Sequence, residues 1–73
     1  MFIVLEIQVS QDDKIAIIPT TYDNMNDALS RFYQTMVSAT QSSCKAHTVE
    51  ILDSTGNISK KETIYHEGGT VNE

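Results

Sequence analysis

Three features are scarce in this sequence of 73 residues: cysteine, basic side chains and long apolar runs. A single cysteine, Cys44, excludes a disulfide within the chain, so a domain with such a small core needs support from elsewhere. Five basic residues against ten acidic ones give a net charge of −5, which argues against nucleic-acid binding, because nucleic-acid binders contact phosphates through Lys and Arg. No apolar run approaches a membrane span, and no basic segment precedes an apolar stretch with a cleavage site. We therefore expect a cytoplasmic protein.

Motifs for catalysis and metal binding are scarce as well. The sequence contains no nucleophile elbow of the G-x-S-x-G type and no glycine-rich loop that opens a helix. Cys44 and His47 have a C-x-x-H spacing and His66 could add a third ligand, but a closed zinc site needs four. Glu6 and Glu50 are a candidate carboxylate pair for acid–base catalysis if they lie across neighbouring strands. We expect no enzyme activity, no metal and no cofactor.

The apolar pattern predicts a single α+β domain of the ββαββ type. Apolar residues from Met25 to Ala39 recur at helical spacing behind Asn24, a favourable N-cap. Alternating and β-branched stretches indicate four strands around this helix. The domain should span residues 1–67, with 68–73 as a flexible tail. The strands are expected at about residues 2–9, 14–21, 46–52 and 58–66.

The connections predict a four-stranded antiparallel sheet with the order 2-1-3-4 and the helix packed on one face. A right-handed crossover through the helix places the third strand beyond the first. Pro19 suits an edge strand because it cannot donate a ladder hydrogen bond. Lys60 and Lys61 suit the opposite edge, where lysine discourages further pairing.

The first strand is apolar on both sides, although the chain has only one helix to cover a sheet face. We assign the side of Ile3, Leu5 and Ile7 to the helix. The opposite side then needs a partner, and strand 58–66 could turn either of its own sides toward that partner. This predicts a homo-oligomer, a dimer or higher, whose interface includes Phe2, Val4 and Leu52.

A second set of residues has the chemistry to hold an anionic, aromatic ligand. Arginine and lysine supply charge, and tyrosine supplies a stacking surface. The set is scattered along the sequence, so we expect it to form a site only if two protomers bring its members together. Its members are Arg31, Tyr33, Lys60, Lys61, Tyr65 and His66.

Three segments resemble a group of short, mostly uncharacterised proteins encoded by bacteriophages and prophages. They are the start of the chain from Met1 to Gln8, the pair Ala46-His47, and Tyr65-His66-Glu67 near the end. The resemblance implies a viral accessory protein in the cytoplasm of a host cell. It supplies no catalytic residue.

Two functions are compatible with these observations. The first is a small oligomeric binding protein that counters host defence, by sequestering a nucleotide-derived signal or by binding a defence protein. The alternative is a structural or assembly protein of a phage particle.

Overall fold

The computed structural model describes residues 1–66, which form a ββαββ domain. The part of the predicted tail at residues 68–73 lies outside the described residues, as does residue 67. The predicted elements are confirmed, with ends shifted by at most a residue or two. They are β1 (Phe2–Val9), β2 (Ile15–Tyr22), α1 (Met25–Thr40), β3 (Ala46–Asp53) and β4 (Ile58–Tyr65).

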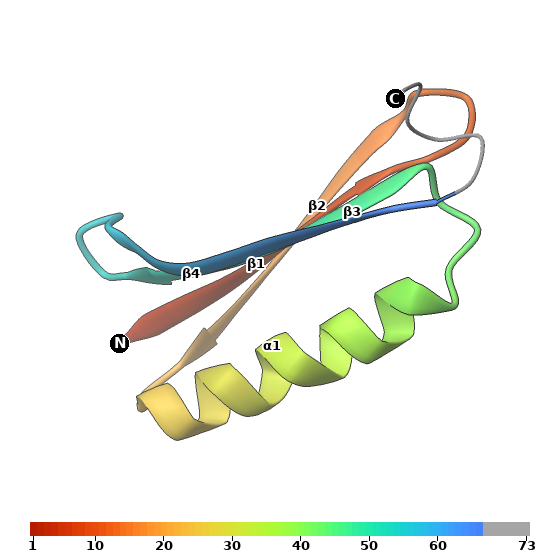
Figure 1. Cartoon of the computed structure of the whole chain (residues 1–73). Coiled ribbons are helices and arrows are strands. Elements are labelled where there is room, and N and C mark those ends of the chain that lie inside the picture. Colours follow the sequence, from red (N-terminus) through yellow and green to blue (C-terminus); the bar gives the residue numbers. More distant parts are fainter. Residues whose placement is uncertain (67–73) are drawn as a thin grey trace.

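The sheet has the predicted order β2-β1-β3-β4, and every neighbouring pair is antiparallel. Pro19 lies on the edge strand β2, and Lys60 and Lys61 lie on the edge strand β4. The chain leaves β2, crosses through α1 and returns as β3 beside β1. Figure 1 shows α1 along one side of the sheet.

Local chemistry explains where the elements begin and turn. The side chain of Asn24 accepts a hydrogen bond of 2.9 Å from the backbone N–H of Asp27, which caps the first turn of α1. Asp13 has a φ of 66° in the turn between β1 and β2, and Gly56 has a φ of 92° between β3 and β4. Aspartate and glycine tolerate this left-handed region better than most residues do.

The core lies between α1 and the sheet. Its fully buried side chains include Val4 from β1, Phe32 from α1, and Val49 and Ile51 from β3. Phe2, Tyr22, Met25, Leu29 and Met36 pack around this cluster.

The prediction of which side of β1 faces the helix is therefore wrong. Val4 is only 2 % exposed and belongs to the core, so the side of Phe2 and Val4 faces α1, and Ile3, Leu5 and Ile7 point away. The register explains the reversal. Val4 is the partner of Ile51, and antiparallel partners point to the same face of a sheet. Because Val49 and Ile51 face the helix, the even-numbered residues of β1 must do so too.

Candidate functional site: an open sheet face and a polar pocket

The sheet face opposite α1, called the open face here, is covered by no element of the described residues 1–66 (Figure 1). Its half formed by β1 and β2 is almost entirely apolar. Cross-strand pairing there joins Val9 to Ile15, Ile7 to Ile17 and Leu5 to Pro19. Ile15 and Ile17 are 67 % and 60 % exposed. A small soluble domain rarely exposes apolar side chains in such a continuous block.

The other half of the open face, formed by β3 and β4, has mixed chemistry. Glu50 and Lys61 form an ion pair of 3.9 Å, and the hydroxyls of Thr48 and Thr63 share a hydrogen bond of 3.0 Å. Ala46 pairs with Tyr65, which is 62 % exposed. The register shift at Ile51 and Leu52 brings Ile58 opposite Leu52. Of the two sides that β4 could present, the side with Lys61, Thr63 and Tyr65 therefore belongs to the open face.

Two of the three predicted interface residues do not lie on this face. Phe2 and Val4 pack under α1, as part of the core or against it. Leu52 does lie on the open face, as the partner of Ile3. Glu6 and Glu50 lie on opposite faces of the sheet, so the structure contradicts the proposed carboxylate pair.

The six predicted ligand residues do not meet within one protomer. Tyr33 and Lys60 lie together at one flank of α1, where the Lys60 ammonium is 5.7 Å from the centre of the Tyr33 ring. Lys61 and Tyr65 are on the open face. Arg31 lines a separate pocket, and His66 lies beside the buried His47, with 6.5 Å between the ring centres.

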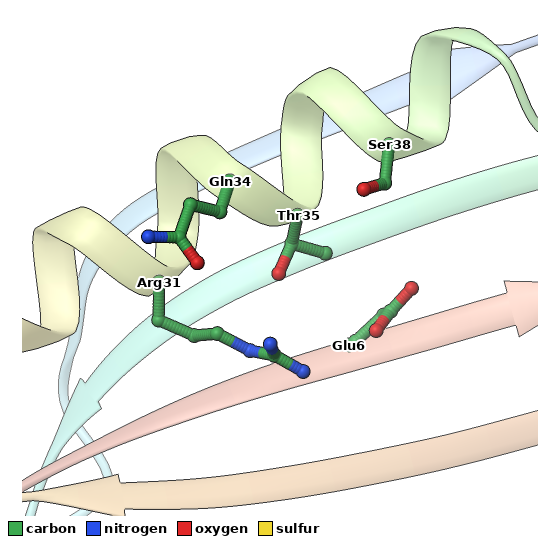
Figure 2. Close-up of a pocket in the computed structure, with 5 residues that line it drawn as sticks. All are labelled: Glu6, Arg31, Gln34, Thr35 and Ser38. Atoms are coloured by element: carbon green, nitrogen blue, oxygen red, sulfur yellow. The ribbon is translucent and has the colours of Figure 1, made fainter.

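The pocket of Arg31 lies between α1 and β1 and has a volume of about 150 Å³. Figure 2 shows Arg31, Thr35 and Ser38 extending from α1 toward Glu6 on β1. Arg31, Thr35 and Ser38 share this flank because residues four and three apart lie on the same side of a helix. Gln34 completes the lining.

Buried and half-buried polar side chains lie beside Glu6. Gln8 donates a 2.9 Å hydrogen bond to Oε2 of Glu6, and Nε2 of His47 lies 3.4 Å from the same oxygen. The imidazole of His47 is not aligned for a hydrogen bond, and neither of its buried nitrogens has a hydrogen-bond partner among the described residues. Cys44 lies nearby, with its sulfur 4.0 Å from Oε1 of Gln8. Within residues 1–66, no group of three or more His, Cys, Asp or Glu side chains is arranged to hold a metal ion.

Sequence reasoning missed most of the pocket. The helical stripe of Arg31, Thr35 and Ser38 was readable from its spacing, as a polar band beside the apolar one. Glu6 was not, because its place under α1 depends on which side of β1 faces the helix.

Comparisons with protein-family models, with curated proteins and with solved structures find no significant match to this chain. Among the helices that the structure describes, none is both long and apolar enough to cross a membrane.

Proposed function

We propose that this chain is a small, non-enzymatic binding protein that works as a homo-oligomer, with the open face as the contact between two copies. The observation that carries the proposal is the uncovered apolar half of the sheet. Burying that half against another sheet removes its isoleucines, leucine and valine from water, which is the dominant favourable term in association.

Charge favours a second copy of the chain as the occupant. The whole chain carries −5, yet the charged residues of the open face are Glu50 and Lys61, which neutralise each other in an ion pair. Two identical acidic molecules therefore meet at this face without strong repulsion. A two-fold axis, the commonest symmetry of homo-oligomers, would place the exposed apolar rows of one copy against those of another.

The size of the open face is sufficient for a specific contact. Strands of eight residues, at about 3.3 Å per residue and about 4.8 Å between strands, give a face of about 26 by 19 Å. Two such faces bury roughly 1,000 Å² together, which is about the area that a specific interface requires.

Sedimentation velocity on the wild type and on two lysine variants tests this proposal. Ile17→Lys places a charge on the exposed apolar half, whereas Val37→Lys adds the same charge on the outer surface of α1, where Val37 is 64 % exposed. We expect an oligomer for the wild type and for Val37→Lys, and a monomer for Ile17→Lys. Circular dichroism should show that all three are folded.

If the wild type is monomeric at all accessible concentrations, the proposal is contradicted. The open face would then be a surface that binds a different protein. An oligomer that survives Ile17→Lys but dissociates on Val37→Lys would place the contact on the helix instead.

The resemblance to phage proteins supports counter-defence as the role of this oligomer, through a defence protein or a nucleotide-derived signal. One chain separates the six ligand residues over both faces of the sheet, and contact through the open face alone leaves Arg31 on the side of α1, away from Lys61. The signal version therefore requires a second contact between protomers on the side of α1. It predicts a rise in melting temperature with a panel of nucleotide-derived signals, and loss of that rise in Arg31→Ala and Lys61→Glu. If the whole panel leaves the melting curve unchanged, a protein target is favoured.

The particle-assembly alternative predicts that the chain co-purifies with virions.

A further inference from the structure

The pocket between α1 and β1 contains two opposite charges that do not neutralise each other. Arg31 and Glu6 both line it, but within residues 1–66 no ion pair joins them and Arg31 has no other acidic partner. A guanidinium and a carboxylate that share a pocket without contact leave room for a molecule between them.

The carboxylate of Glu6 is held in place and still has an available oxygen. Its Oε2 receives the hydrogen bond from Gln8 and lies near His47, and its side chain is only 14 % exposed. Oε1 receives no hydrogen bond from the described residues, and the side chain of Glu6 lines the pocket. Glu6 is thus an oriented acceptor rather than a mobile surface charge.

The rest of the lining is polar and is also available. Thr35 is 6 % exposed, and neither its hydroxyl nor that of Ser38 forms a hydrogen bond within the described part of the chain. The amide nitrogen of Gln34 binds Ser30, which leaves its carbonyl oxygen free to accept. No aliphatic or aromatic side chain lines the pocket, so it offers nothing to a large apolar group.

Size limits the ligand further. A cavity of about 150 Å³ is known to hold a molecule as large as benzene, which has about six heavy atoms. A nucleotide is several times larger than this volume, so most of it would remain outside the pocket. A simple anion fits by volume, but Glu6 would repel it.

The geometry points to a small zwitterionic α-amino acid as the ligand of this pocket. Its carboxylate contacts the guanidinium of Arg31, and its ammonium donates to Oε1 of Glu6 and to Gln34. The hydroxyls of Thr35 and Ser38 supply further hydrogen bonds. The pocket lies on the helix side of the sheet, so this binding does not depend on self-association through the open face.

NMR titration of the full-length, isotope-labelled protein tests the assignment. Glycine, L-alanine and L-serine are the probes, and we expect saturable shifts of the backbone amides of Glu6, Thr35 and Ser38. Acetate and methylammonium each carry one of the two charges. These two should produce no saturable shift at the same amides.

Arg31→Gln should weaken binding of the best probe by about tenfold or more, the loss expected for a charge-assisted contact. Lys14→Gln removes the same charge from an exposed turn and should leave the affinity unchanged. The assignment is overturned if none of the three amino acids gives site-specific shifts, or if acetate alone reproduces those of glycine. Unchanged affinity in a folded Arg31→Gln variant would overturn it as well.

Discussion

At the scale of single residues, the most consequential one is Val4. It was predicted on the exposed side of the first strand, yet it lies in the core beside Ile51 and under α1. A substitution there therefore reports on folding rather than on assembly. The residues that report on assembly are the exposed isoleucines of β2.

Val4→Ala should lower the free energy of unfolding by about 2 kcal/mol, because it removes two buried methyl groups and leaves a cavity. Val37→Ala is the matched control. Val37 is 64 % exposed on α1, and alanine is the better helix former, so this change should leave stability equal or slightly higher. Urea denaturation of both variants at one protein concentration measures the difference. Equal losses would contradict the assigned side of β1.

Asp53 gives a pH dependence with a defined sign. The hydroxyl of Thr55, followed by the backbone N–H groups of Asn57 and Thr55, donates to its carboxylate and lowers its pKa from 3.8 to about 2. Because the folded pKa is lower than the unfolded one, the stabilisation is complete above pH 3.8 and is lost as the pH falls toward 2.

Thr55→Val should raise the pKa of Asp53, because it removes the hydroxyl donor, and should flatten the loss of stability in that pH range. Thr55→Ser keeps the hydroxyl and should keep the low pKa. A carboxyl-carbon NMR titration of the three proteins measures the pKa directly. An unchanged pKa in Thr55→Val would show that the backbone donors suffice.

At the scale of elements, the sequence predicted the strand order but not the sides of the strands. Edge signals such as Pro19 and Lys61 do not depend on register, so they identified the outer strands correctly. The sides of β1 do depend on it, and a strand that is apolar on both sides contains no alternation to reveal them. The register between β1 and β3 is also not set by a hairpin, because α1 separates them in the chain.

The residues of the pocket and the orientation of β4 also depend on strand register, which the sequence does not reveal. Arg31, Thr35 and Ser38 share a helix flank that spacing alone predicts, whereas Glu6 enters the pocket only through the register of β1. In β4, the shift opposite Ile51 and Leu52 breaks the simple alternation, so the position of Ile58 could not be read from the sequence.

The β3–β4 hairpin depends on Gly56, whose φ of 92° is unfavourable for other residues. Gly56→Ala should lower the free energy of unfolding by about 1–2 kcal/mol. A β-carbon at this position meets nothing within 4 Å, so the loss comes from the backbone alone. Gly56→Asn should lose less, since asparagine tolerates the left-handed region better. Thermal or urea unfolding measures both. An alanine variant as stable as the wild type would mean that the turn relaxes to another conformation.

At the scale of the whole molecule, one helix covers one face of a four-stranded sheet, and no element of residues 1–66 covers the more continuously apolar face. A second copy of the chain would supply the missing layer. One apolar side of β1 would then pack against α1, and the other would pack against the second copy. Stability should then depend on assembly, so the midpoint of thermal unfolding should rise with protein concentration. A midpoint independent of concentration would indicate that the monomer is stable by itself.

Self-association through the open face is tested most directly by an isotope-filtered NOE experiment on an equal mixture of labelled and unlabelled protein, which detects only contacts between different copies. We predict intermolecular NOEs from the methyl groups of Ile7, Ile15 and Ile17 on the open face, and none from Val37 on the outer surface of α1. Intermolecular NOEs confined to α1, or none at any concentration, would contradict self-association through the open face.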